Sequence, residues 1–456
     1  MLQYLQQHIS ELGVSARFRI HRICHNSHNG RKIPLEWVAT MSRIVKYKCA
    51  RCGKEYNDDN VPPNDGCGGR IDITFDLEAV MDSFSKSRLE RAKGGLWKYF
   101  DLMPLRKKES IVTLGEGDTP LVQSKRLSQE MGLKSLYLKL ETLCPSGSFK
   151  DRPICVGVSR AAEDGAQTVS AASSGNAAAA MSTYAARAGL RAVVFVPEDA
   201  PAGKLIHLRT LGARVFRVHK VEEGVDPTTT LLKAACSELG WTPSPSFGPF
   251  NCFQFEGTKS LGYEIAEQLA WSPPDWILFP TGSGGLAAGT MKGLWEFQQM
   301  GLIDRLPRPV VVQPEGCAPI VRAFKERQDP LNIVPWDSNE TVAGGLADPF
   351  PWDGDAALRY LNLADGKAVA VEDTLIERYL VLLGKLEGVF AEPSGVAALA
   401  GLDVLLKEGV IDRSDSVVIP ITGSGFKDLG TPDRLTPPVS LIGPRVDELK
   451  RALEEA

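Results

Sequence analysis

The residue in this chain best placed for covalent chemistry is Lys150, in the segment PSGSFKDR at residues 145–152. A strand-like run at residues 136–141 precedes it, and a helix is expected to begin directly after it. The positive end of a helix disfavours a charged lysine, so the pKa falls and the neutral amine is favoured. A neutral lysine amine can condense with an aldehyde. Taken alone, the segment more often means an exposed lysine on a surface helix.

Three further turns follow strand-like runs, which is where ligands bind in open α/β sheets. The first is SSGN at residues 173–176, before a predicted helix at residues 177–187. The N–H groups at a helix N-terminus suit a carboxylate, and Asn176 adds a side-chain donor. An ordinary helix cap made by Ser or Asn has the same pattern.

The second turn is PTGSGG at residues 280–285, which opens a predicted helix at residues 286–297. Small residues let backbone N–H groups close around a phosphate. The glycine spacing also satisfies the dinucleotide fingerprint G-x-G-x-x-A, which is a weak match by itself. The third turn is TGSGFKD at residues 422–428, where the hydroxyl of Thr422 could face a heteroaromatic nitrogen. A simple exit from a strand into a loop looks the same.

From Ile111 onward, short apolar runs rich in β-branched residues alternate with Ala-rich helical stretches. The runs lie at residues 192–196, 215–218, 276–279, 310–312 and 417–421. This alternation predicts an α/β fold with mostly parallel sheets covered by helices. Residues 331–360 are rich in Pro, Gly and Asp, and we expect them to cross the surface.

The region before this alternation contains a cysteine knuckle, Cys49-Ala-Arg-Cys52, followed by Cys67. Paired Cys-x2-Cys knuckles hold zinc in ribbons, but Asn64 stands where the partner of Cys67 would be. Zinc on these cysteines would need an outside ligand, and the candidates are Asp65, Cys24 and His28. A ribbon that folds without metal is the other interpretation.

Bulk properties narrow the class of protein. The chain has 456 residues, a net charge of −4 and a pI near 6.0, so broad electrostatic binding of nucleic acid is not expected. Its sequence contains no apolar run long enough to cross a bilayer, and nine scattered cysteines indicate a reducing compartment. We therefore expect a cytoplasmic protein. Residues 1–41 stand apart and are interpreted as a mis-assigned start or an N-terminal extension.

With GEGDTPL at residues 115–121 and EPSG at residues 392–395, these motifs resemble the threonine synthase family over about residues 44–430. The family is a fold-type II branch of the pyridoxal-phosphate enzymes. The resemblance implies two open, mostly parallel α/β subdomains, a likeness to a zinc ribbon near the N-terminus, an amino-acid substrate and a homodimer. The expected divisions are residues 42–76 for the ribbon, 77–456 for the catalytic region and about 155–255 for the smaller subdomain.

The resemblance also assigns roles to single residues. It implies that Lys150 forms the internal aldimine with pyridoxal phosphate and, once released by substrate, moves the α-proton. Asn176 would bond the phenolic oxygen of the cofactor, and Thr422 would face its pyridine nitrogen. The remaining implied contacts are Gly282, Ser283, Gly284 and Gly285 for the cofactor phosphate, Ser173, Ser174 and Asn176 for the substrate carboxylate, Thr119 for the amino-acid pocket, and Cys49, Cys52 and Cys67 for a structural zinc.

One segment departs from the family. Threonine synthases convert O-phosphohomoserine and water into threonine and phosphate, so they bind a second phosphate. In bacterial members a motif Asn-Ser-x-Asn-Pro-Tyr-Arg supplies a serine and an arginine, and the matching positions here hold Pro249 and Gln254. Losing a charge-assisted contact weakens phosphate binding, unless Lys259, Lys204 or Arg209 compensates.

Four alternative functions stay open at this point. A paralogue could carry out β-replacement, as a cysteate synthase does on phosphoserine and sulfite. A paralogue could instead carry out β-elimination, as a serine or threonine dehydratase does. More distant are an NAD-binding dehydrogenase, from the glycine spacing, and a zinc-ribbon module without enzymatic activity.

Overall fold

The computed structural model describes residues 18–20, 39–41, 43–57, 61–81, 84–220 and 226–455. Most of the predicted extension at residues 1–41 lies outside these ranges, as do Cys24 and His28. The described parts of that extension are two short strands, β1 (Phe18–Ile20) and β2 (Ala39–Met41), which pair antiparallel.

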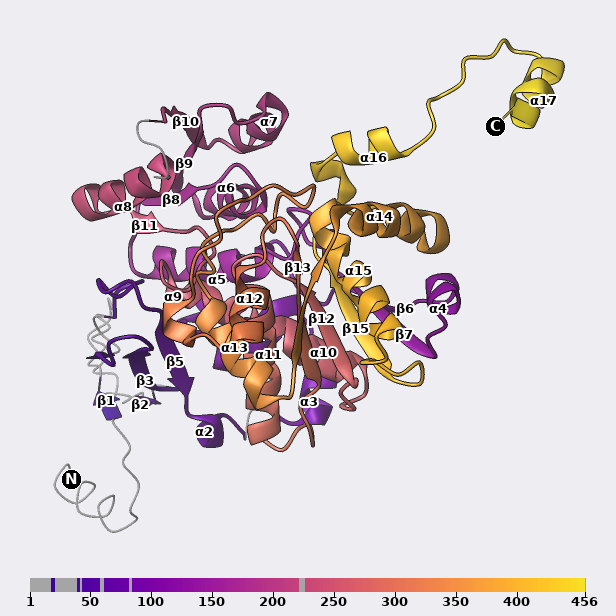
Figure 1. Cartoon of the computed structure of the whole chain (residues 1–456). Helices are drawn as coiled ribbons and strands as arrows, with labels where there is room; N and C mark the ends of the chain where they lie inside the picture. The colour runs from indigo at the N-terminus through magenta and orange to yellow at the C-terminus, as the bar shows by residue number, and fades with distance from the viewer. Residues whose placement is uncertain are drawn as a thin grey trace, which may run out of the picture.

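A six-stranded sheet forms the centre of the molecule (Figure 1). The strand order is β14-β13-β12-β15-β7-β6, and each neighbouring pair is parallel except β6 with β7. The strands are β6 (Leu121–Gln123), β7 (Ser135–Leu140), β12 (Trp276–Pro280), β13 (Arg308–Pro314), β14 (Lys367–Val371) and β15 (Ser416–Ile421). The prediction of parallel sheets is therefore confirmed, and the predicted strands at residues 276–279, 310–312 and 417–421 lie within this sheet.

Both faces of this sheet are covered by helices, as its apolar strands require. Successive side chains of β12 point to opposite faces. Ile277 and Phe279 join one hydrophobic core, with residues of α10, α11, α12 and α13, whereas Trp276 and Leu278 join another, with residues of α4, α14 and α15. These helices are α4 (Arg126–Met131), α10 (Lys259–Gln268), α11 (Gly285–Gln299), α12 (Pro319–Glu326), α13 (Gly354–Leu363), α14 (Asp373–Glu387) and α15 (Pro393–Lys407).

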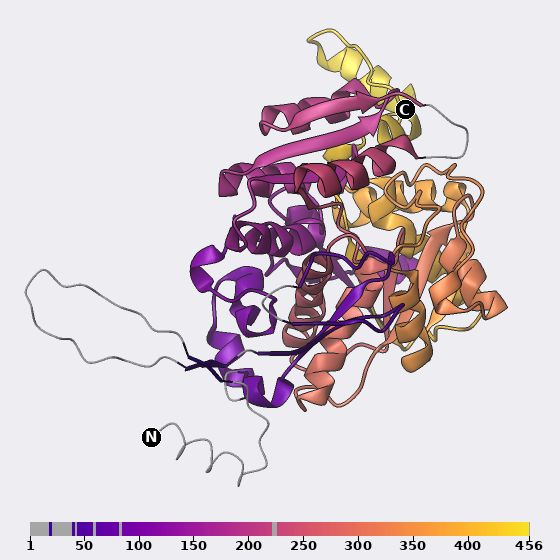
Figure 2. The ribbon, with the colours of Figure 1, turned by 90° about the vertical axis from the view of Figure 1, so that its left-hand side faces the viewer.

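A second, smaller sheet has the order β10-β9-β8-β11 and is parallel throughout. Its strands are β8 (Thr168–Ala172), β9 (Arg191–Pro197), β10 (Arg214–Val218) and β11 (Thr242–Pro243). Both views place this sheet, in magenta, at one end of the molecule (Figures 1 and 2). The helices nearest it in sequence are α5 (Asp151–Glu163), α6 (Asn176–Ala188), α7 (Ala202–Thr210), α8 (Pro227–Leu239) and α9 (Cys252–Gly257).

A three-stranded antiparallel sheet near the N-terminus carries the cysteines. Its order is β4-β3-β5, with β3 (Ile44–Cys49), β4 (Glu55–Tyr56) and β5 (Ile71–Phe75). This region is bound to the larger body of the molecule by hydrogen bonds, since Cys252 N donates to Pro63 O over 2.8 Å and Lys292 Nζ donates to Ile73 O over 2.7 Å. The small sheet and its loops are thus attached to α9 and α11.

Shorter elements complete the described chain. They are the helices α2 (Leu77–Met81), α3 (Lys86–Arg91), α16 (Gly430–Leu435) and α17 (Val446–Glu455), and the 3-10 turns η1 (Gly95–Leu102), η2 (Lys108–Ser110), η3 (Glu141–Leu143), η4 (Pro330–Asn332) and η5 (Gly425–Lys427). Within the described ranges, every helix is too short or too polar to cross a membrane.

One prediction about the fold is wrong in part. Residues 331–360 were expected to cross the surface, and some of them are exposed. However, Asp353 is completely buried, and α13 begins at Gly354 within this stretch. The segment turns inward because Asp353 N donates to Ser283 O over 2.9 Å, which ties it to the start of α11.

Candidate active site

The sheet order explains how distant motifs meet. β12, β15 and β7 are neighbours and run parallel, so their carboxyl ends lie at one edge of the sheet. The loop before Lys150 is directly bonded to the end of β15, since Phe149 N donates to Thr422 O over 3.0 Å and Ser424 N donates to Gly147 O over 2.9 Å. The lysine loop and the loop that carries Thr422 are therefore in contact through their backbones.

Lys150 caps the N-terminus of α5, as its segment predicted. Its ammonium lies 4.7 Å from the ring centre of Phe149 and 5.8 Å from that of Phe247, and it donates to Ser246 Oγ over 2.8 Å. Burial lowers the pKa of Lys150 to about 8, although the carboxylates of Asp353 and Asp348 act in the opposite direction. An amine with such a pKa is partly neutral near pH 7, which is what nucleophilic attack requires.

The two aspartates connect Lys150 to the glycine turn. Asp353 lies against that turn, because a Cβ added at Gly285 would be 2.9 Å from Asp353 Oδ2. Burial raises the pKa of Asp353 to about 7, with Arg70 opposing, and burial likewise raises the pKa of Asp348 to about 7, with Lys150 opposing. Gly248 N donates to Asp353 Oδ1 over 3.1 Å, and Ser246, in the same loop, accepts from Lys150 Nζ over 2.8 Å, so the amine and the glycine turn border one site.

The glycine turn has the form of a phosphate cradle. Gly284 has φ +106°, a conformation that other residues rarely adopt, and a Cβ there would lie 2.8 Å from Asp353 O. Gly284 also caps α11 without a side-chain hydrogen bond, so the first N–H groups of this 15-residue helix have no side-chain cap. Together with the nearby amine of Lys150 and the buried Thr422, this turn fits pyridoxal phosphate.

The SSGN turn lies across from the EPSG motif. Asn176 is the first residue of α6 and Gly175 is its N-cap, so the N-cap position holds neither Ser nor Asn. Ser173 Oγ accepts from Gly175 N over 3.1 Å. Asn176 Nδ2 donates to Glu392 Oε1 over 2.7 Å, and Glu392 N donates to Gly423 O over 3.0 Å. Ser173 and Ser174 are half-buried beside it. The turn thus reaches the loop that carries Thr422.

Thr119 lies in a buried network of charges rather than on an open wall. Its hydroxyl donates to Glu141 Oε1 over 2.6 Å and accepts from Arg152 over 3.2 Å. Arg152 also pairs with Glu264, over 2.7 Å, as does Lys139, over 2.6 Å. Despite its burial, Glu264 has a pKa well below the usual range because Arg152 and Lys139 surround it. This network fixes the first turn of α5, and hence Lys150.

The position where an arginine was expected is occupied in a different way. Gln254 is completely buried, accepts from Ser246 N over 2.9 Å, and donates from Nε2 to Ser244 Oγ. Lys259 is also buried, paired with Glu256 over 2.8 Å and with Glu296 over 3.0 Å. Its charge is therefore balanced within the core. Arg209 is exposed on α7, and the side chain of Lys204 is outside the described part.

The cysteines come together with one carboxylate. Sγ of Cys49 and Sγ of Cys67 are 3.5 Å apart, Cys52 Sγ is 3.5 Å from Asp65 Oδ2, and the four ligand atoms all lie within 4.8 Å of one another. Asp65, one of the three outside ligands considered, lies here, whereas Cys24 and His28 are outside the described residues. Asn64 instead donates to Phe250 O, over 3.2 Å.

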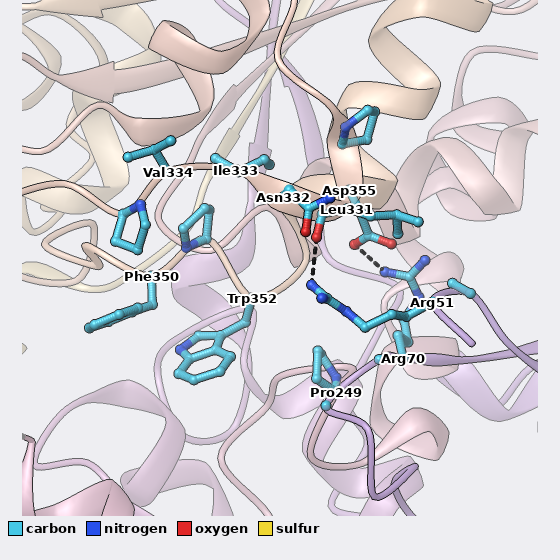
Figure 3. A pocket seen from close by; sticks show the side chains of 16 residues that line it. Arg51, Arg70, Pro249, Leu331, Asn332, Ile333, Val334, Phe350, Trp352 and Asp355 are labelled. Carbon is cyan, nitrogen blue, oxygen red and sulfur yellow. Dashed lines mark hydrogen bonds and ion pairs between the residues drawn. The ribbon is translucent and has the colours of Figure 1, made fainter.

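The cysteine sheet also borders a pocket of about 460 Å³ (Figure 3). Arg51 donates to Leu331 O over 2.5 Å across it, and Arg70 pairs with Asp355 over 2.9 Å. Arg70 is also 3.8 Å from Asp353, the residue packed on the glycine turn. Through Arg70, which directly precedes β5, the cysteine sheet thus contacts the aspartate that packs on the glycine turn.

Sequence reasoning missed Ser246, Asp348, Asp353 and Arg70. Ser246 and the aspartates lie in loops rich in Pro and Phe, without a periodic pattern to indicate their burial. Asp353 follows Trp352 and precedes Gly354, and such an Asp-Gly pair signals only a turn. These residues reach the site through contacts between segments far apart in the chain, which no local signal records.

Comparison with known proteins decides the family. The family model described as pyridoxal-phosphate dependent enzyme matches residues 112–423. A threonine synthase of Methanocaldococcus jannaschii is 37% identical over 90% of this chain and 99% of its own length, and one of Methanosarcina acetivorans is 35% identical over 89% and 98%. The chain belongs to the threonine synthase family. The family's cofactor is pyridoxal phosphate, and the glycine turn and Lys150 of this chain fit that cofactor.

Solved structures agree on the fold. A processed threonine deaminase isoform of Solanum lycopersicum superimposes with a TM-score of 0.61 at 22% identity, covering 76% of this chain and 95% of that one. An L-serine ammonia-lyase of Rhizomucor miehei gives 0.59 at 21% identity, covering 70% and 96%. At such identities the likeness shows the fold-type II architecture alone. The dehydratase, cysteate synthase, dehydrogenase and non-enzymatic readings gain no support from these comparisons.

Proposed function

We propose that this protein is a threonine synthase that converts O-phosphohomoserine and water into threonine and phosphate. The observation that carries the proposal is the family membership, at 37% identity over nearly the whole chain, joined to a lysine amine beside a glycine cradle. In the net reaction, the bond between the γ-carbon and the phosphate oxygen breaks, and a hydroxyl from water is added at the β-carbon. The β-carbon loses one proton, the γ-carbon gains one proton in place of the phosphate, and the remaining proton of the water leaves with the phosphate.

The residues of this chain then take distinct roles. Pyridoxal phosphate, when bound, supplies the electron sink that makes the substrate's carbon-bound protons acidic. The glycine turn at residues 282–285 would hold its phosphate, Asn176 its phenolic oxygen and Thr422 its ring nitrogen. Lys150 takes and returns protons at the α-carbon, since its pKa of about 8 lets the amine exist in both forms near neutral pH.

The substrate would be held at its two ends. Ser173, Ser174 and Asn176 would receive the carboxylate at the uncapped start of α6. We propose Lys427 as the partner of the substrate phosphate. Its side chain is half-buried and its Cε lies 3.1 Å from the position of a Cβ on Gly147, in the loop before Lys150. Burial lowers the pKa of Lys427, while the carboxylates of Glu392 and Asp151 raise it.

The substrate assignment is tested by product analysis. The purified enzyme is incubated with O-phosphohomoserine, and in parallel with O-phosphoserine and sulfite. Release of phosphate with threonine from the first mixture supports the proposal, and release of phosphate from the second mixture alone contradicts it. Lys427→Ala should raise KM for O-phosphohomoserine about 10-fold or more, whereas Arg209→Ala, a change of an exposed cation on α7, should leave KM unchanged.

The proposed structural metal is zinc held by Cys49, Cys52, Cys67 and Asp65. Three thiolates and one carboxylate within 4.8 Å make a set of the size and chemistry of a closed tetrahedral site. Metal analysis of the purified protein should give about one zinc per chain. Asp65→Ala should reduce that ratio, and Cys236→Ser, at a half-buried cysteine on α8, should not. An unchanged zinc content in the Asp65 variant would exclude this carboxylate as the fourth ligand.

We also propose that residues 155–255 form a subdomain that moves against the rest of the catalytic region at residues 77–456. The separate four-stranded sheet at residues 168–243 supports this division, as does the position of Asn176 on the small side and Glu392 on the large side. Closure would bring the SSGN turn onto the substrate. The homodimer expected from the family resemblance is part of the same proposal, and analytical ultracentrifugation tests it.

A further inference from the structure

Ser246 occupies a position that none of the roles described above includes. It lies in the loop between β11 and α9, and its Oγ is 2.8 Å from Lys150 Nζ. The other close neighbours of this amine are the rings of Phe149 and Phe247, which attract a cation but offer no hydrogen-bond acceptor of comparable strength. Ser246 is therefore the neutral hydrogen-bonding partner that the described part of the site provides for the lysine.

The backbone of Ser246 is held in an unfavourable conformation. Its φ is +69°, in the left-handed region that residues with a Cβ rarely adopt. Strain of this kind persists where surrounding contacts impose it, and it gathers at functional sites. In this strained conformation the hydroxyl of Ser246 contacts Lys150.

Gln254 imposes this conformation. Its Oε1 accepts from the N–H of Ser246 over 2.9 Å, and its Nε2 donates to the hydroxyl of Ser244. Gln254 is completely buried against Gly157, where any Cβ would lie 2.2 Å from Gln254 Cγ. The residue that stands in place of the expected arginine thus acts on the lysine through Ser246, and both ends of its amide are occupied by Ser246 and Ser244.

We propose that Ser246 is a positioning residue that holds the amine of Lys150 whenever that amine is not bonded to the cofactor. The inference rests on the proposed role of Lys150. A hydroxyl suits this task because it accepts a hydrogen bond from the ammonium form and donates one to the neutral form, so one contact serves both states. No proton is gained or lost by Ser246 itself. The charged groups that face the amine in the same space are the carboxyls of Asp348 and Asp353.

Two substitutions distinguish the effect of the Ser246 hydroxyl from the effect of its backbone strain. Ser246→Ala removes the hydroxyl and keeps the strain, whereas Ser246→Gly removes both, since glycine adopts positive φ freely. We expect each variant to lower kcat about 10-fold, because a hydrogen bond to a charged group is lost. KM should change little, because no contact with the substrate is removed. Ala270→Gly, which relieves a positive φ of +52° at an exposed position, should leave kcat unchanged.

A second readout uses the protein without cofactor. The pH dependence of acylation of Lys150 by an amine reagent, read by mass spectrometry of its peptide, gives the titration of the amine directly. The bond that the hydroxyl accepts from the ammonium form is charge-assisted and is the stronger of the two, so its loss should move this midpoint down by up to about one unit in both Ser246 variants. A midpoint that stays in place, or a glycine variant with wild-type kcat beside a slow alanine variant, would overturn the proposal. The proposed function fails separately, if Lys150→Ala retains activity.

Discussion

The pH dependence of cofactor capture follows from the environment of Lys150. An ordinary lysine has a pKa of 10.5, and burial of Lys150 lowers its pKa to about 8. At pH 7 about one-tenth of this amine is therefore neutral, against about 0.03% for an ordinary lysine, which is a roughly 300-fold advantage. Since the neutral amine is the reactive form, capture should accelerate as the pH rises through 8 and level off above 9.

The assay mixes cofactor-free protein with pyridoxal phosphate by stopped flow from pH 6 to pH 10, and follows the visible band of the lysine-bound cofactor. Asp348→Asn provides a directed perturbation, because its carboxylate raises the pKa of Lys150. Its loss should move the midpoint below 8 and speed capture at pH 7. Nα-Acetyl-lysine, measured in parallel, is the control for an unburied amine. A wild-type rate that rises only above pH 10 would refute this account of the site.

Three further outcomes test the supports of the site. Arg152→Met should lower the free energy of unfolding in urea by about 3–5 kcal/mol, because it leaves buried Glu141 without its cation and buried Glu264 with Lys139 alone. Arg434→Met, at an exposed ion pair, should leave the free energy of unfolding nearly unchanged. Equal losses in the two variants would contradict the network's role. Gly284→Ala should abolish retention of the cofactor on gel filtration, because a Cβ at Gly284 meets Asp353. Gly301→Ala should retain the cofactor, because a Cβ at Gly301 meets nothing within 4 Å. Retention by both variants would count against the cradle. Arg70→Met should weaken cofactor affinity in equilibrium titration by releasing Asp353, and unchanged affinity would mean that the cysteine sheet does not support the site.

The architecture could be predicted because it depends on local patterns. The apolar run at residues 276–279 is buried on both sides, and such runs separated by helices are typical of parallel sheets. The turns after β7, β12 and β15 could be placed at one edge for the same reason, which is why Lys150, the glycine turn and Thr422 were expected together and lie together.

The rest of the site depends on contacts between distant segments. Gln254 was interpreted as a lost phosphate ligand, but whether it would point to a substrate or to Ser246 depends on the fold of the loop at residues 244–251. Lys259 was a candidate cation, yet it is paired with Glu296, 37 residues away. Asp353 was placed on the surface because Pro and Gly surround it, and its burial follows from packing against Ser283. No periodicity in the sequence carries this information.

The most direct measurement identifies the residue that carries the cofactor. The protein is loaded with pyridoxal phosphate, reduced with borohydride and digested, and the modified peptide is sequenced by mass spectrometry. The account predicts a stable phosphopyridoxyl group on Lys150 in the wild-type protein and no visible band in Lys150→Ala, with an unchanged circular dichroism spectrum. Modification of a different lysine, or a Lys150→Ala protein that still shows the band, would contradict it.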